Sequence, residues 1–108
     1  MSGEVTFVRI YLREGEHIMR DLVKHLHATH EVAGLTVFQG MAGIGSDGRL
    51  RTASLVDLSL DLPLAVEFFD EPRRVESALA DVAEKYDLHH VVTWPAKVHG
   101  ATNPNEGE

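Results

Sequence analysis

A chain of 108 residues with a net charge of −7 is the size of one domain. Its acidity argues against general nucleic-acid binding, which draws on phosphate neutralisation by Lys and Arg. It contains no cysteine, so disulfides, thiolate zinc sites and cysteine nucleophiles are excluded. No apolar run approaches the roughly 20 residues that cross a bilayer. The first residues lack the pattern of a signal peptide, so we expect a cytoplasmic protein.

The first part of the chain predicts a strand, a helix and a second strand. Residues 5–12 are rich in β-branched and aromatic side chains that alternate with period two, which is typical of a strand. Residues 16–31 predict a helix that stops before Gly34, and residues 35–39 predict the next strand. The apolar stripe expected on this helix is Ile18, Met19, Leu22, Val23 and Leu26.

The second part of the chain predicts two strand segments, a helix and a last strand. Residues 52–60 alternate like a strand, and residues 62–70 form the strongest strand after the first, with a bend at Pro63. Residues 70–86 predict a helix with Asp70 as N-cap and Pro72 in its first turn. Residues 89–98 predict a last strand, interrupted at Pro95. The apolar stripe expected on the second helix is Val75, Leu79, Val82 and Tyr86.

This order of elements predicts an α+β fold over residues 1–99. Strand, helix, strand, strand, helix and strand give a ferredoxin-like βαββαβ sandwich, in which two helices cover one face of an antiparallel sheet. Residues 100–108 are polar and predict a disordered C-terminal tail.

The stretch FQGMAGIGSDGRLRTA, residues 38–53, holds four of the nine glycines, and two arginines follow the last of these glycines. It is not a Walker loop, because no Gly-Lys-Ser/Thr follows, and it is not a dinucleotide fingerprint, because a strand rather than a helix follows it. Glycines allow close backbone approach, so N–H groups here could surround an anion, with Arg49 and Arg51 adding charge. The alternative is a long hairpin loop whose glycines only serve turns.

Seven histidines raise the question of a metal site. His27 and Glu31 lie one turn apart on the first predicted helix and could supply two ligands, with His89 as a further candidate. The pattern His-x-x-x-His is absent from that helix. His30 falls in the apolar stripe, where a satisfied core or interface histidine is the better interpretation.

Catalysis has little support, since nothing assembles a nucleophile and a base. Glu67 lies within an apolar strand, where an unpaired carboxylate would be costly. It therefore either forms a salt bridge with Arg9 on a neighbouring strand or faces a ligand. Trp94, the single tryptophan, is expected in the core or at an interface.

Several motifs resemble one family. The segments VRIYL, VAGLTVFQGMAGIG, DLPLAVEFFD and EPRRVESAL are similar to the PII-like proteins known as domain of unknown function 190, and the resemblance covers about residues 5–98. It implies a ferredoxin-like homotrimer whose sheets pack inward. It also implies ligand clefts between subunits beside a flexible T-loop, here residues 40–51.

The resemblance further implies a function. Relatives bind adenine nucleotides and regulate partners such as a membrane transporter or channel. Gln39 stands where the family usually has arginine, and the second phosphate-binding loop of PII proteins is absent, with His89 and His90 in its place. This difference favours AMP or another small ligand over a triphosphate. The residues that the resemblance places at the base of the loop are Thr36, Gly40, Gly43 and Gly45.

We therefore expect a non-enzymatic, trimeric regulator that needs no resident cofactor. Its effector is a small anion, with AMP, ADP, ATP or cyclic AMP as the candidates. The alternative is a metal-responsive trimer that binds metal through His27, Glu31 and His89. The expected ligand-binding residues are Thr36, Gln39, Gly40, Gly43, Gly45, Arg49, Arg51 and Glu67.

Overall fold

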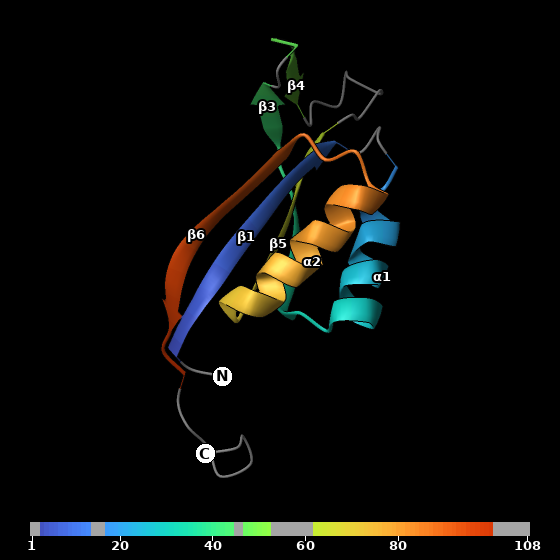
Figure 1. Ribbon diagram of the computed structural model, residues 1–108. Coiled ribbons are helices and arrows are strands. Elements are labelled where there is room, and N and C mark those ends of the chain that lie inside the picture. The colour runs from blue at the N-terminus through green and yellow to red at the C-terminus, as the bar shows by residue number, and fades with distance from the viewer. Residues whose placement is uncertain (1–2, 14–16, 45–46, 53–61, 101–108) are drawn as a thin grey trace.

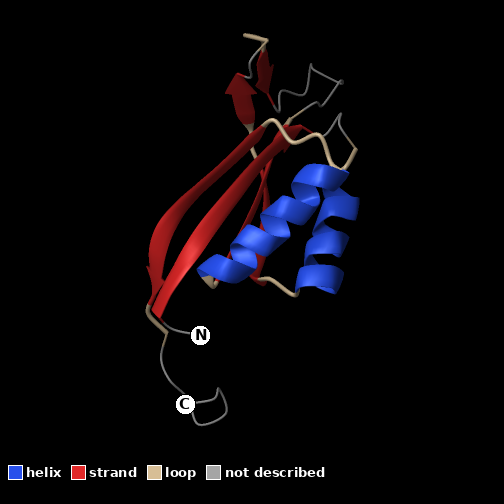
Figure 2. Ribbon diagram, viewed as in Figure 1, coloured by secondary structure: helices blue, strands red, loops and turns tan. Residues whose placement is uncertain are grey.

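The computed structural model describes residues 3–13, 17–44, 47–52 and 62–100. Four strands form an antiparallel sheet in the order β2-β5-β1-β6, and both helices lie on one of its faces (Figure 1; Figure 2). The predicted α+β, ferredoxin-like fold is confirmed. The elements are β1 (Gly3–Arg13), α1 (Met19–His30), β2 (Ala33–Gln39), β3 (Ala42–Ile44), β4 (Leu50–Thr52), β5 (Pro63–Asp70), α2 (Pro72–Lys85) and β6 (His90–Val98).

The core lies between the sheet and the helices. Alternate residues of β1 and β5 point toward the helices, and Val8, Ile10, Val66 and Phe68 are fully buried there. Burying each such side chain contributes about 1.5–3 kcal/mol. The helices meet them with the predicted stripes, of which the fully or nearly fully buried members are Leu22, Leu26, Val75 and Val82.

The stop signal predicted for the first helix is wrong. The first helix ends at His30 because Glu31 adopts a left-handed conformation, with φ of 50°. Gly34 is therefore no helix stop but part of β2. Its φ of 58° and its contact with the Phe69 ring leave no room for a Cβ atom.

Asp70 is not the N-cap of α2; that position belongs to Glu71, and Pro72 takes the first helical position as predicted. The Asp70 carboxylate is 2% exposed and accepts hydrogen bonds from two backbone N–H groups. Ala33 N lies 3.1 Å from Oδ2 and Glu71 N lies 2.8 Å from Oδ1. Arg74 Nε lies 3.4 Å from Oδ2. Asp70 thus joins the start of β2 to the start of α2.

The middle and the end of the chain also differ from expectation. A short hairpin, β3 and β4, forms inside the predicted loop. Of the strand predicted at residues 52–60, only Thr52 lies within the described residues, in β4. The last strand runs through Pro95 without interruption, which an edge strand allows because one side needs no ladder hydrogen bonds. From residue 101 the predicted tail lies outside the described residues.

The face of the sheet without helices, called here the open sheet face, is rich in aromatic side chains. Phe7 stacks between Phe69 and Trp94, with ring centroids 6.1 and 4.8 Å apart. Arg9 forms the predicted ion pair with Glu67. The open sheet face consists of Phe7, Arg9, Tyr11, Thr36, Phe38, Ala65, Glu67, Phe69, Val92 and Trp94, as the strand register places them.

Candidate functional site

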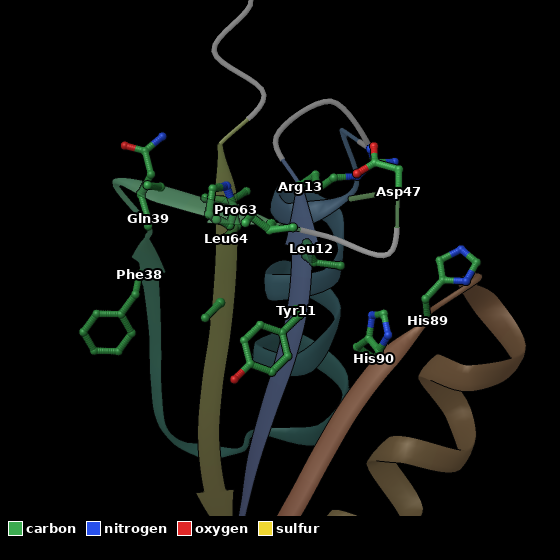
Figure 3. A pocket seen from close by; sticks show the side chains of 15 residues that line it. Tyr11, Leu12, Arg13, Phe38, Gln39, Asp47, Pro63, Leu64, His89 and His90 are labelled. Atoms are coloured by element: carbon green, nitrogen blue, oxygen red, sulfur yellow. The ribbon is translucent and has the colours of Figure 1, made fainter. Parts of the chain in front are cut away.

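A cleft of about 920 Å³ opens at one end of the sheet, beside the β3–β4 hairpin (Figure 3). We call it the hairpin cleft. The last residues of β1 and β2 form its walls together with the first residues of β5 and β6. Because these four strand ends meet at one edge, residues far apart in the sequence converge there.

The base of the hairpin packs tightly on Pro63. The N–H of Gly40 donates a hydrogen bond to the Pro63 carbonyl over 2.7 Å. A Cβ atom on Gly40 would lie 2.7 Å from Pro63 Cγ, and one on Gly43 would lie 3.0 Å from it. These two glycines therefore permit close packing between the hairpin and β5. The N–H of Gly40 serves that contact rather than an anion.

The cleft combines aromatic surface with polar groups. Tyr11 and Phe38 provide rings, and their residues are 43% and 52% exposed. Arg13 brings a guanidinium group from the end of β1, while His89 and His90 bring imidazoles from the start of β6. Figure 3 shows His89 and His90 at the right of the view and Tyr11 near its middle. This mixture suits a planar ligand that carries an anionic group.

The hairpin also contributes a carboxylate. Asp47 lines the cleft and accepts a hydrogen bond from the backbone N–H of Arg49 through Oδ1, 3.0 Å away. Gly48 beside it has φ of 72°, a conformation that glycine adopts readily. This local turn leads the chain into β4.

A hydrogen bond connects the cleft to the open sheet face. Arg9 Nη1 lies 3.3 Å from Tyr11 Oη. This bond, and then the pairing with Glu67, raise the pKa of the Arg9 guanidinium. The Tyr11 hydroxyl is thus oriented by a permanent positive charge.

The ligand-binding residues expected from the sequence separate into two groups. Gln39, Gly40 and Gly43 line the hairpin cleft. Thr36 and Glu67 face each other across β2 and β5, further along the open sheet face.

The remaining expected residues are placed less completely. Arg49 is exposed in the hairpin. Arg51 pairs with Gly43 in the β3–β4 ladder, but its side chain lies outside the described residues, as does Gly45.

The ligand-binding residues predicted from the sequence did not include four residues of the cleft, namely Tyr11, Arg13, Phe38 and Asp47. Tyr11 and Phe38 carry only the alternation expected of any strand, and Arg13 follows the strand as part of a break in the pattern. Their common signal is position, since Tyr11, Arg13 and Phe38 lie at the ends of strands that leave the sheet at the same edge.

The residues of the alternative metal site do not converge. His89 lines the hairpin cleft, whereas Glu31 follows the opposite end of α1 (Figure 1). Within the described residues, the group whose ligand atoms come together is a different one, His25, His30 and Asp81, at the contact of the two helices. Neither α1 nor α2, the helices of the described part of the chain, is long and apolar enough to cross a membrane.

Comparison with known proteins gives a family and a relative that are similar in sequence. The model of a family described as "Uncharacterized ACR", DUF190, matches residues 5–98. A UPF0166 protein of Aquifex aeolicus (strain VF5) is 33% identical over 54 residues. That match spans only about half of each chain, 50% of this one and 51% of the relative.

Solved structures resemble the fold over most of its length. CPII from Thiomonas intermedia K12, bound to ADP and bicarbonate, is similar with a TM-score of 0.62 at 17% identity, covering 91% of this chain and 89% of that one. A putative PII-like signalling protein from Thermus thermophilus gives a TM-score of 0.61 at 14% identity, covering 90% and 89%. At these identities the likeness establishes the fold.

Proposed function

The chain belongs to the DUF190 family and has the fold of PII-like proteins, and from this premise we propose that it is a non-enzymatic regulator that binds an adenine nucleotide in the hairpin cleft. The observation that carries the proposal is the cleft itself. It places aromatic rings, a guanidinium group and two imidazoles around one opening. The similar protein CPII was solved with ADP and bicarbonate, and in another structure with ADP, AMP and bicarbonate.

The cleft residues suggest a division of roles. Tyr11 and Phe38 would contact the faces of the adenine ring, since stacking on an aromatic side chain contributes about 1–3 kcal/mol per base. Arg13 would bind the phosphate through charge-assisted hydrogen bonds. Gln39 would donate a hydrogen bond to the ligand from its side-chain amide, and His89 and His90 would complete the polar wall.

The other expected ligand-binding residues enter this proposal as supporting positions. Arg49 and Arg51 belong to the hairpin, which would close over the ligand, and Gly45 stays a sequence-based candidate. Thr36 and Glu67 lie on the open sheet face, where they would contact a neighbouring subunit rather than the nucleotide.

The assembly proposed is a homotrimer formed through the open sheet face. Tyr11, Phe38 and Val92 are large apolar residues of that face and are each more than 40% exposed. Monomers rarely leave large contiguous apolar patches in water. Packing three such faces together would bury Val92 against a neighbouring subunit and would add a second wall to each hairpin cleft, opposite Tyr11 and Phe38.

The β3–β4 hairpin is proposed as the surface that binds a partner protein, such as a membrane transporter or channel. Met41, Ile44 and Leu50 are 79%, 68% and 63% exposed there. A ligand shifts such a segment only if it binds its two conformations with different affinity. A ligand in the hairpin cleft would act on the hairpin through direct contact, since Gly40, Gly43 and Ile44 line the cleft.

Calorimetry with AMP, ADP, ATP and cyclic AMP, each with and without bicarbonate, tests the proposed ligand. We expect binding to one or more nucleotides, weakened about 10–100-fold by Arg13→Gln, because a hydrogen bond to a charged group contributes about 1.5–3 kcal/mol. Arg73→Gln is the matched control, since Arg73 is an exposed residue of α2 outside the cleft. No heat and no thermal shift with any nucleotide at millimolar concentration would refute the proposal.

Light scattering tests the assembly separately. We expect a particle of three times 11.9 kDa. Val92→Asp, which places a charge on the open sheet face, should shift it toward the monomer. A wild-type monomer at micromolar concentration would remove the shared cleft from the proposal.

A further inference from the structure

Two histidines of α1 and one aspartate of α2 meet where the helices contact each other. Nε2 of His25 lies 2.5 Å and Nε2 of His30 lies 2.7 Å from the same atom, Oδ2 of Asp81. The three ligand atoms all lie within 4.8 Å of one another. We infer that His25, His30 and Asp81 form a binding site for a divalent transition-metal ion, with Zn²⁺ as the ion of best fit. The hairpin cleft uses none of these residues.

The donor set decides the class of metal. Imidazole nitrogen and carboxylate oxygen are both ligands of Zn²⁺, and three protein ligands leave a fourth position for water. Ca²⁺ and Mg²⁺ prefer ligand sets made of oxygen alone. Soft ions that depend on thiolates are poorly matched, since the chain has no cysteine.

The geometry requires only a small adjustment. Metal–ligand bonds of about 2.0–2.1 Å place the donor atoms of a tetrahedral site about 3.3 Å apart. The present separations from Asp81 Oδ2 are 2.5 and 2.7 Å. These two distances must lengthen by about 0.6–0.8 Å, and the two imidazole nitrogens, which lie within 4.8 Å of each other, must reach the same separation. The ion would then replace the hydrogen bonds by which the two rings hold the carboxylate.

Partners around the cluster orient its ligands. Nδ1 of His25 lies 3.3 Å from Oγ1 of Thr29, which can accept a hydrogen bond from Nδ1–H and so leave Nε2 as the ligand atom. Hydrogen bonds from His30 and then His25 lower the pKa of Asp81, which keeps its carboxylate ionised. Any proton that an Nε2 donates to Asp81 would leave or move to Nδ1 on metal binding.

The burial of the three side chains favours a site whose imidazoles are fixed and whose carboxylate is accessible to water. The side chains of His25 and His30 are 16% and 15% exposed, whereas that of Asp81 is 40% exposed. The imidazoles are therefore fixed between the helices, and water can reach the carboxylate side. A hydrogen bond that only joins two helices needs one imidazole and one carboxylate. Two imidazoles directed at a single oxygen exceed that need.

Titration of tag-free protein with Co²⁺, in the absence of nucleotide, tests the site. We expect visible d–d absorption bands, displacement of Co²⁺ by Zn²⁺, and one ion per chain by calorimetry with a Kd in the micromolar range or below. Zn²⁺ should also raise the Tm, because the three ligands come together only in the folded state. His30→Gln and Asp81→Asn should each weaken binding at least 100-fold and abolish the shift in Tm.

Matched variants separate this site from adventitious binding. His27→Gln removes an exposed histidine of the same helix, and His89→Gln removes one from the hairpin cleft; both should bind Co²⁺ like the wild type. Thr29→Val keeps all three ligands and should weaken binding about 10–100-fold through the lost orientation of His25. Circular dichroism confirms that each variant is folded. Absent Co²⁺ bands at millimolar concentration, or equal binding by wild type and both ligand variants, would overturn the inference.

Discussion

Replacing the buried carboxylate of Asp70 by the methyl group of alanine should destabilise the fold by about 2–4 kcal/mol. Asp70→Ala leaves the N–H groups of Ala33 and Glu71 without their acceptor, which lies 3.1 and 2.8 Å away in the wild type. A buried donor left unsatisfied costs about 1–3 kcal/mol, and because both of these hydrogen bonds are only partly buried, each loss lies in the lower part of that range. Loss of the pairing with Arg74, whose side chain is 49% exposed, adds at most about 1 kcal/mol. Relief from burying a charge offsets part of this sum.

Urea unfolding followed by circular dichroism measures the loss. With m near 1.5 kcal/mol/M, typical of a small domain, the midpoint should fall by roughly 1.3–2.7 M. Asp70→Asn keeps one side-chain acceptor and should lie between alanine and the wild type. All variants must be compared at one protein concentration, because oligomerisation makes apparent stability depend on it.

Asp87→Ala provides the matched control. The Asp87 side chain is 92% exposed, so its removal should change stability by no more than about 0.5 kcal/mol. A midpoint for Asp70→Ala within about 0.3 M of the wild type would show that the carboxylate does not join β2 to α2 as described.

Three further changes test other parts of the structure. Phe68→Ala removes a fully buried ring and should cost about 3–5 kcal/mol in the same urea assay; a loss below about 1 kcal/mol would contradict its place in the core. Gly40→Ala directs a Cβ atom to within 2.7 Å of Pro63 and should cost about 1–3 kcal/mol, and a neutral effect on the unfolding midpoint would contradict the tight hairpin base. Burial, and then the hydrogen bond to Asp21, raise the pKa of Tyr86 to about 12. Since this lies above the unfolded value of about 10, the stabilisation is complete below pH 10 and is lost as pH rises toward 12; absorbance at 295 nm of wild type and Tyr86→Phe should show Tyr86 still protonated at pH 11.

The fold was predictable because its long elements have strong periodic patterns. Alternation in β1 selected buried residues such as Ile10, and helical spacing selected Leu22 and Val82. The β3–β4 hairpin was not predictable, since strands of three residues are shorter than one full cycle of a usable pattern. The N-cap of α2 was misassigned because an acidic residue before a proline fits both Asp70 and Glu71.

The sites were harder to predict because they depend on tertiary packing. Gln39 and Gly40 could be selected by the glycine-rich stretch, but Arg13 reaches the cleft only through the register of the sheet. His25 and His30 are five residues apart, which is not a spacing that marks ligand pairs on one helix face. They converge because Asp81, from the other helix, lies between them.

The strand order has a consequence for how the chain is made. β1 is hydrogen-bonded to β5 on one side and to β6 on the other, and the latter pairing joins Gly3 to Val98. During synthesis on the ribosome the first strand must therefore wait for nearly the whole chain before its second edge is covered. Pairings of such long sequence separation slow folding, and an uncovered strand edge invites contact with other chains. A circular permutant in which β6 directly precedes β1 would turn this latest contact into a local hairpin that forms at the start.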